Sequence, residues 1–464
     1  MGAFGNFLDA LIAVVVKINT FMWGPPMLIV LFGGGVFMTV ALGFFQFKHF
    51  GFIMRNTLGK IVKQRKEGEG TVSAFQAATS ALCNTIGASN IVGVPVAIAM
   101  GGPGAIFWMW AAGAFGLAIK WAEITLGVHY REKDKKDGTF VGGPAHYLSK
   151  GLKKARWLGP LFAFALMLEI VPSIGSQAVA ASENLAGVGI PKIYTGIFIA
   201  ILAGIVVFGG IKRIGKFSEK FIPITVLAYS LFAWIIILMN FTQIPAAFGL
   251  IFKAGFTPQA AVGGFAGATV AAAARWGVAR GVYSNEAGMG QAAIAHSAAV
   301  TDHPARQGMW AIFEVVMDTA FANTTTALLV LTTGLWRIFT PDVASTIPAE
   351  AIGTVFGLGF ARYFIAVMLF LFVFTTVIGN AFYGEQMARY LFGHKFSKFM
   401  LGVYLVFVVI ASTSDIGTLY NFIDLLLVLV VVPNVVGVCL QVKTCRQLKQ
   451  DFFDNEKYCP QKAK

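Results

Sequence analysis

The feature that most limits the fold of this chain is a series of eleven long hydrophobic runs. Each run has about 20 residues, the length of an α-helix that crosses the hydrocarbon core of a bilayer. Hydrophobic residues make up 57% of the chain and charged residues only 12%, which is more apolar surface than a soluble core can bury. The sequence therefore predicts an all-α polytopic membrane protein with eleven transmembrane helices, at 27–47, 74–99, 104–128, 158–182, 193–211, 217–239, 258–274, 308–335, 352–380, 396–412 and 418–442.

The distribution of basic residues predicts the orientation of these helices. Alternate connections hold 30 of the 36 Lys and Arg residues, namely 48–70, 129–157, 212–220, 275–307, 381–398 and the tail from 443. Because cytoplasmic loops carry the excess of Lys and Arg, we expect an external N-terminus and a cytoplasmic C-terminus in the cell (plasma or inner) membrane. The net charge of +14 is then a consequence of topology, and it does not indicate a nucleic-acid partner.

The cysteines and the first residues add two expectations. All four cysteines lie inside predicted helices or on the cytoplasmic side, where a disulfide framework is not expected: Cys83, Cys439, Cys445 and Cys459. Asp9 and Lys17 interrupt the apolar run of the first 22 residues, which lack a small-residue cleavage site. We interpret that segment as an interfacial helix on the outer surface.

Helices two to six and seven to eleven form two sets of five. Because five is odd, the second set must cross the membrane in the opposite orientation to the first, as in the inverted repeats of many secondary transporters. We therefore divide the chain into an N-terminal interfacial helix with one extra transmembrane helix (1–47), two five-helix repeats (71–239 and 258–442) and a cytoplasmic tail (443–464).

The first helix of each set is interrupted by Gly and polar residues, over 81–95 in one set and 263–269 in the other. Corresponding interruptions in two repeats indicate a binding site at the bilayer midplane, since unwound backbone frees carbonyl and N–H groups for ions and ligands. For 263–274 alone, tight packing of Gly and Ala explains the composition equally well. The first interruption is harder to explain by packing, because polar residues at bilayer depth are costly unless they line a cavity: Asn84, Thr85, Ser89 and Asn90, followed by Pro95.

Three motifs resemble those of a known family. The segment 101–116, which begins Gly-Gly-Pro-Gly-Ala-Ile-Phe-Trp-Met-Trp, is similar to the signature of the alanine-or-glycine:cation symporter family, and 284–290 (Ser-Asn-Glu-Ala-Gly-Met-Gly) and 383–385 (Tyr-Gly-Glu) resemble its other motifs. The resemblance extends to archaeal sodium:alanine symporters. The family is distantly similar to the bacterial leucine transporter, whose five-plus-five fold would leave the first helix here outside the core. The resemblance implies symport of a small neutral amino acid, alanine or glycine, with sodium.

The resemblance also implies sodium ligands. Segment 83–90 with Pro95 is similar to the broken first core helix of that fold, and 372–376 resembles the helix that completes the first sodium site. The implied ligands of that site are the carbonyls of Cys83, Ile86 and Phe372 and the hydroxyls of Thr375 and Thr376, and those of a second site are Thr85 and Asn90. Hydroxyls and unwound carbonyls suit a hard cation without a costly buried charge. The alternative for the two threonines is a hydrogen bond to the preceding turn, which is common in membrane helices.

A zwitterionic amino acid needs N–H groups for its carboxylate and oxygens for its ammonium group. We expect the carboxylate at the restart of the broken helix, near Ala88, Ser89 and Asn90. Gln177, in a second polar interruption, is expected to contact the substrate, although an interhelical hydrogen bond explains it equally well. Asn84 and Thr85 are also expected to contact the substrate. Small and aromatic residues would complete a pocket that excludes long side chains: Gly263, Gly264, Phe265, Gly267 and Phe374. Asn380 departs from the Trp that we expect in many family members, which changes this wall of the pocket.

Five acidic residues lie in or beside predicted helices: Glu123, Glu169, Glu314, Asp318 and Asp424. Membrane carboxylates are commonly functional. Glu123 lies one turn from Lys120 and Glu314 near a basic inner loop, so both have possible structural partners. Asp318, deep in the eighth helix, is our candidate for a gating or coupling group.

Several other functions are not supported by the sequence. Segment 210–216 matches most of a phosphate-binding loop, but Phe217 replaces the Ser or Thr that would hold magnesium. No His-Glu-x-x-His motif is present, and a channel would be expected to repeat a pore motif across subunits. We therefore expect a transporter that is not an enzyme and has no organic cofactor. A proton-coupled amino-acid transporter of the same fold is the alternative, and it would favour a titratable side chain at the cation site.

Overall fold

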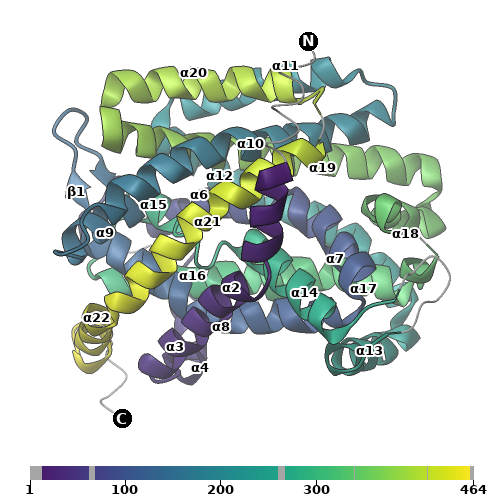
Figure 1. Ribbon diagram of the computed structural model, residues 1–464, viewed down its shortest axis with the longest axis horizontal. Coiled ribbons are helices and arrows are strands. Elements are labelled where there is room, and N and C mark those ends of the chain that lie inside the picture. The colour runs from purple at the N-terminus through teal and green to yellow at the C-terminus, as the bar shows by residue number, and fades with distance from the viewer. Residues whose placement is uncertain (1–12, 62–67, 260–266, 339, 415, 460–464) are drawn as a thin grey trace.

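The computed structural model describes residues 13–61, 68–259, 267–338, 340–414 and 416–459 as a bundle of helices (Figure 1). Within these residues, seven helices are long and apolar enough to cross a membrane, and up to nine if each of two bent helix pairs is one span. The seven are α8 (Gly104–His129), α10 (Leu158–Ala186), α12 (Gly210–Met239), the continuous segment Pro304–Thr332, α19 (Leu358–Phe392), α20 (His394–Ala411) and α21 (Ile416–Leu440). The count of eleven helices and the inverted repeat stay predictions.

Shorter helices connect these spans or lie beside them. They are α2 (Pro25–Leu28), α3 (Gly34–Ala41), α4 (Phe45–Lys48), α5 (Phe50–Asn56), α9 (Pro144–Gly151), α11 (Lys192–Val207), α13 (Ile244–Phe256), α18 (Ile347–Phe356) and α22 (Val442–Asp454). α11 corresponds to the predicted helix 193–211. Segment Pro304–Thr332 consists of α16 (Pro304–Val315), the wide π-helical turn η5 (Val316–Asn323) and α17 (Thr324–Thr332).

The two bent pairs lie where the sequence predicts the first two transmembrane helices. Ala13–Met22 and Pro25–Ala41 meet at 43°, and Ala74–Thr85 and Ser89–Gly101 at 48°. Of the predicted interfacial helix, residues 1–12 lie outside the described residues. The remainder packs against α21, because Asn19 Nδ2 donates to the Asn421 carbonyl oxygen (2.7 Å).

The long helices form two groups that meet at the broken helix. α10 packs against α19, α20 and α21, and α8 packs against α16 and α14 (Val270–Asn285). Between these groups, α6 (Ala74–Thr85) contacts α12, α19 and the short helix α15 (Ala292–His296). α6 begins with a capping box in which Ser73 and Gln76 bond to each other's backbone N–H groups. Figure 1 shows α21 crossing the face of the bundle diagonally toward α22.

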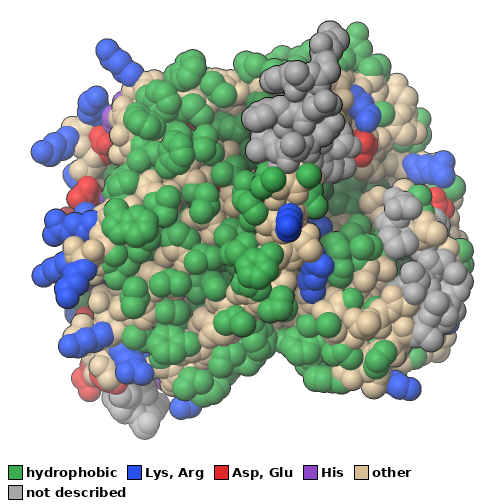
Figure 2. Space-filling model, viewed as in Figure 1, with side chains coloured by type: hydrophobic (Ala, Val, Ile, Leu, Met, Phe, Trp, Pro, Cys, Tyr) green, Lys and Arg blue, Asp and Glu red, His purple; other side chains and the backbone are tan. Residues whose placement is uncertain are grey.

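Basic side chains gather along one edge of the molecule. Figure 2 shows them on the left, where Figure 1 places α9, α22 and the antiparallel pair β1 (Glu132–Lys133) and β2 (Phe140–Val141), while hydrophobic side chains dominate the middle of the face. α22 is fixed to the end of α3, because Arg446 Nε and Lys449 Nζ donate to the carbonyl oxygens of Ala41 (2.7 Å) and Leu42 (2.8 Å). The basic residues of several predicted cytoplasmic segments thus lie on the same edge, and the orientation of this edge in the membrane stays a prediction.

The structure shows a second interruption at a place that we did not predict, while the predicted one at 263–269 lies largely outside the described residues. Gly263, Gly264 and Phe265 lie outside the described residues, and α14 begins only after Thr269, whose side chain accepts from the Ala272 N–H (3.1 Å). The interruption that interacts with the first one lies instead at 286–291, between α14 and α15.

Local backbone conformation explains the interruption at 286–291. Glu286 adopts the left-handed conformation (φ 58°), and Gly288 and Gly290 also have positive φ, so a helix cannot continue through them. In the Gly- and Ala-rich run, Gly267 also has positive φ (86°), and a regular helix begins after it at Val270.

Candidate functional site

The first interruption separates α6 from a wide turn, η3 (Ser89–Gly93), and from α7 (Val94–Gly101). Ile86 is extended (φ −95°, ψ 103°), and the Gly87 N–H donates to Asn90 Oδ1 (2.8 Å) instead of to a helical carbonyl. Pro95 cannot donate a backbone hydrogen bond, which favours the wide turn before it. The chain is therefore unwound where the sequence predicts it.

The two interruptions contact each other through side chains. The Glu286 carboxylate, in the second interruption, accepts hydrogen bonds from Asn84 Nδ2 and from Thr85 Oγ1 (3.2 Å), both in the first. Asn84 Nδ2 also donates to Gln291 Oε1 (3.0 Å). Glu286, Thr85 and Gln291 are buried. Asn84 and Thr85, which we predicted as substrate contacts, thus bond to the neighbouring interruption.

A buried group of polar side chains, here called the Asp318 cluster, lies beside these interruptions. Asp318 Oδ1 accepts from Asn90 Nδ2 (2.6 Å) and Ser284 Oγ (2.7 Å), and Oδ2 accepts from Thr319 Oγ1 (2.9 Å) and Asn323 Nδ2 (3.3 Å). Each member is at most 3% exposed. Carboxylate, amide and hydroxyl oxygens are the ligands that hard cations prefer, so the chemistry of this cluster suits sodium.

Sequence reasoning found two members of the Asp318 cluster, Asn90 and Asp318, and missed three. Asn323 lies five residues after Asp318, and these two positions share a face only because η5 is a wide π-helical turn. Ser284 lies in a segment that we predicted to be cytoplasmic. The signal available was the concentration of uncharged polar residues around Asp318, which includes Thr319 and Asn323.

A narrow pocket adjoins the Asp318 cluster. Three predicted substrate contacts line it, Ala88, Ser89 and Gln177, together with Ser284 and Asn323 of the cluster. The other lining residues combine small, aromatic and basic side chains: Val92, Gly93, Val94, Met109, Ser176, Ala180, Arg280, Tyr283 and Tyr420. Its volume of about 30 Å³ leaves little free space in this conformation. The pocket is therefore formed by both interrupted helices, with α10 and α21.

The predicted threonine ligands lie close to the first interruption. Thr375 and Thr376 each donate to the Phe372 carbonyl oxygen (2.8 and 2.9 Å), which is the back-bonding that we considered as the alternative. α19 nevertheless contacts the unwound segment here, because a Cβ atom added to Gly87 would lie 2.6 Å from Thr376 Oγ1. Likewise, a Cβ atom on Gly379 would lie 3.1 Å from Asn84 Cβ. The structure thus brings Thr376 next to the segment that holds Cys83 and Ile86, both buried.

Two predicted substrate contacts lie away from the pocket. Phe374 packs against Phe217 and Phe221 of α12, with ring centroids 5.5 and 5.9 Å apart, and it is not among the residues that line the pocket. Gly267 lies before α14, next to the bridge between Gln259 and Ala268. Phe374 therefore does not line the pocket in this conformation, and Phe265, the other aromatic residue that we predicted there, lies outside the described residues.

A fully buried ion pair contacts the residue before the second interruption. Lys120 Nζ lies 3.1 Å from Glu314 Oε2 and donates to the Asn285 carbonyl oxygen (2.8 Å) at the end of α14. Glu314 Oε1 also lies 2.5 Å from His296 Nε2. Glu123, which we had considered as the partner of Lys120, instead accepts from Asn434 Nδ2 (2.5 Å).

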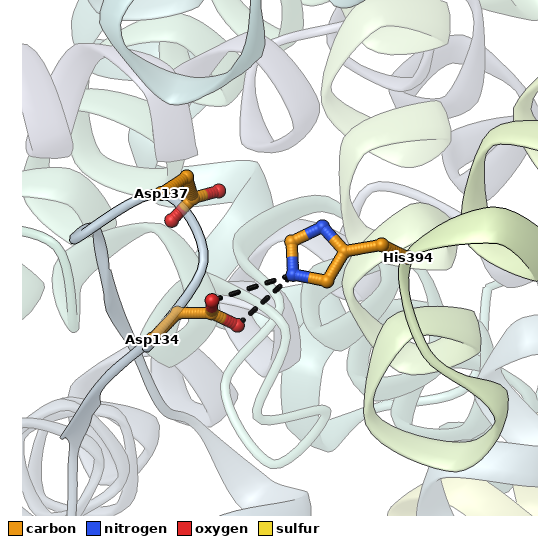
Figure 3. A group of neighbouring side chains, drawn as sticks. All are labelled: Asp134, Asp137 and His394. Carbon is orange, nitrogen blue, oxygen red and sulfur yellow. Dashed lines mark hydrogen bonds and ion pairs between the residues drawn. The ribbon is translucent and has the colours of Figure 1, made fainter.

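Asp134, Asp137 and His394 form a group whose ligand atoms lie within 4.8 Å of one another (Figure 3). Arg389 Nη2 pairs with both carboxylates, at 2.7 Å to Asp134 Oδ2 and 2.8 Å to Asp137 Oδ2. Burial alone would raise the pKa of Asp134, but the Lys136 N–H and the Arg389 guanidinium together hold that pKa well below its usual range. Because Arg389 already balances these charges, we interpret the group as an ion-pair network that joins the β1–β2 hairpin to α19 and α20.

Comparison with known proteins agrees with this architecture. A sialic acid symporter described as Na⁺-coupled, solved in a substrate-bound outward-open state, superimposes with a TM-score of 0.51 over 89% of this chain and 97% of its own, at 14% identity. At that identity the likeness shows a shared transporter fold.

Relatives by sequence are more similar. The uncharacterized transporter YflA of Bacillus subtilis is 46% identical over 97% of this chain and 95% of its own length. The sodium/alanine symporter AgcS of Methanococcus maripaludis is 36% identical over 92% of this chain and 94% of its own. The family model described as "Sodium:alanine symporter family" matches residues 8–463. The chain therefore belongs to the sodium:alanine symporter family, a family of transporters rather than enzymes.

Proposed function

We propose that this protein carries a small neutral amino acid, alanine or glycine, into the cell together with sodium, by alternating access. The observation that carries this proposal is the Asp318 cluster, an oxygen-rich buried group at two interrupted helices beside a narrow pocket. Sodium is a cargo ion here, and a carboxylate with neutral oxygens suits its binding at bilayer depth. The name of the Methanococcus maripaludis relative supports alanine and sodium as the cargo.

The substrate would lie against the restart of the first helix. The N–H groups near Ala88 and Ser89 would meet its carboxylate. Gln177, whose buried Oε1 has no hydrogen-bond partner among the described residues, would accept from its ammonium group. One sodium ion would be held by the Asp318 cluster, which includes Asn90. A second would lie between the two segments that meet at Gly87, with the ligands Cys83, Ile86, Phe372, Thr375 and Thr376.

Uptake of labelled alanine into proteoliposomes tests the proposal. We expect an inward sodium gradient to drive accumulation, while a proton gradient without sodium does not. Excess unlabelled glycine should compete and leucine should not, since overfilling a packed cavity costs about 1–3 kcal/mol. Accumulation driven by a proton gradient alone would favour the proton-coupled alternative, and competition by leucine would contradict the small substrate.

Removing both threonine hydroxyls should weaken the sodium site between the two segments that meet at Gly87. We expect Thr375→Ala with Thr376→Ala to raise the sodium concentration for half-maximal uptake about tenfold, which corresponds to ~1.4 kcal/mol of lost ion binding. Thr332 and Thr333, an adjacent pair that also back-bonds to its own helix, provide the matched control. If both double variants keep the wild-type sodium dependence, Thr375 and Thr376 are not ligands.

The orientation of the chain can be tested by labelling single cysteines in a variant that lacks the native ones. Lys135→Cys, at the basic edge, should react with an impermeant reagent only from the cytoplasm, and Thr346→Cys only from outside. Both positions are exposed, so a failure to react cannot be explained by burial. Reaction of position 346 from the cytoplasm would contradict the external N-terminus.

A further inference from the structure

Glu169 on α10 differs from the other buried carboxylates of the described residues. It is 1% exposed, its Oε2, like Glu123 Oε2, has no hydrogen-bond partner there, and its side-chain contact is with the Ser173 hydroxyl. The other five buried carboxylates each contact an amide or a cation: Glu123 contacts Asn434, Glu286 contacts Asn84, Glu314 contacts Lys120, Asp318 contacts Asn90, and Glu385 contacts Lys398. Glu169 therefore has the least compensation for a negative charge.

Glu169 has no ion-pair partner among the described residues, and the basic residue of the pocket, Arg280, interacts electrostatically with Tyr283. The titratable groups that face Glu169 from packed helices are Tyr404 of α20 and Tyr283 of α14, with Glu286 at longer range. The Tyr404 hydroxyl donates to the Met167 carbonyl oxygen (2.8 Å) rather than to the carboxylate. A bare carboxylate in such surroundings is costly, and a carboxyl group that keeps its proton avoids most of that cost.

A polar path connects Glu169 to the pocket. Glu169, Ser173 and Gln177 are spaced four residues apart, so they lie on one face of α10. The Ser173 hydroxyl faces both the Glu169 carboxyl group and the Tyr283 hydroxyl, and it accepts from Asn380 Nδ2 (3.4 Å). Gln177 and Tyr283 line the pocket. A change in the occupancy of the pocket can thus reach Glu169 through two intervening side chains.

We propose that Glu169 is a proton-binding site and that its proton travels with the substrate, in addition to sodium. This inference rests on the proposed symport function. The carboxylate takes up a proton from the outer solution before the pocket closes and holds it as a neutral acid while it is buried. It releases the proton to the cytoplasm when opening of the inner side hydrates the group. No covalent bond other than the O–H bond forms or breaks.

The first test needs no substrate. The full chain in lipid at neutral pH should show an infrared band of a protonated carboxyl group that is absent in Glu169→Gln, a variant with the shape of the neutral acid. Glu183→Gln is the matched control, because Glu183 is on the same helix but is exposed and pairs with Lys192 (3.3 Å). The Glu183→Gln variant should keep the infrared band of the protonated carboxyl group. Identical spectra of the wild type and Glu169→Gln would overturn the proposal.

The second test measures proton movement. In proteoliposomes with a sodium gradient and a pH-sensitive dye inside, alanine should acidify the lumen for the wild type and for Glu183→Gln. Any alanine that Glu169→Gln accumulates should enter without acidification. Alanine uptake by the wild type without acidification would overturn proton transport. If the wild type takes up no alanine, the proposed function is wrong, and the infrared difference alone decides whether Glu169 binds a proton.

Discussion

Replacing Asp318 with Asn should raise the sodium concentration for half-maximal uptake by at least about a hundredfold, or ~2.7 kcal/mol of ion binding. The substitution removes the negative charge of the Asp318 cluster and leaves its shape almost unchanged. At a separation of 4 Å and an effective dielectric constant of about 20, one pair of unit charges is worth roughly 4 kcal/mol, which exceeds this threshold. The new amide would also present donors to Ser284, Asn90 or Asn323, which now donate to the carboxylate.

The sodium dependence of initial uptake rates measures this effect. Glu350→Gln is the control, since Glu350 pairs with Arg362 (3.4 Å) at a partly exposed position and should leave the dependence unchanged. If a folded Asp318→Asn variant keeps the wild-type sodium dependence, the Asp318 cluster does not bind the transported sodium.

Replacing Lys120 with Met should lower the free energy of unfolding by about 3–5 kcal/mol. Lys120 and Glu314 are both fully buried, so loss of the cation leaves a buried carboxylate whose remaining ion-pair partner, among the described residues, is His296. The Asn285 carbonyl oxygen loses a donor as well, which weakens the end of α14. Thermal unfolding in one detergent, at matched protein concentration, measures the change.

Two comparisons separate charge from packing in that result. Lys120→Met combined with Glu314→Gln should recover much of the lost stability, because replacing both members of a buried pair costs less than removing one. Lys192→Met breaks an exposed pair with Glu183 and should cost at most about 1 kcal/mol. If the double variant is no more stable than the single one, the pair is not the origin of the loss.

The sequence predicted the features of this protein that depend on local chemistry. Hydrophobic length indicated spanning helices, and the concentration of polar residues before Pro95 indicated the first interruption, which the structure places at Ile86–Ala88. The interruption at 286–291 was not predicted, because we placed 275–307 in a cytoplasmic connection. This interruption begins at Glu286, whose backbone is left-handed. That conformation could not be predicted for Glu286, since non-Gly residues rarely adopt it.

Partners that are distant in sequence could not be predicted. Lys120 and Glu314 lie on helices nearly 200 residues apart, and the nearer Glu123 was the reasonable candidate until the packing of α8 against α16 was known. Asp318 could be singled out, because a membrane carboxylate requires compensation, but its donors come from three separate segments. Sequence thus indicates which residues need partners, and the fold decides which partners they have.

The contact of the first interruption and the end of α6 with α19 has a mechanical consequence. Gly87 faces the Thr376 side chain and Gly379 faces the Asn84 side chain, so at each point only one side chain lies between the two backbones and few atoms resist a change of their crossing angle. α19 has 35 residues, and the 21 residue steps from Gly379 back to Leu358 span roughly 30 Å at about 1.5 Å per residue. A rotation of about 10° at this fulcrum displaces the far end by roughly 5 Å over that length. A small rotation of α19 near a bound ion would therefore move the distant end of this helix by about the height of one helical turn.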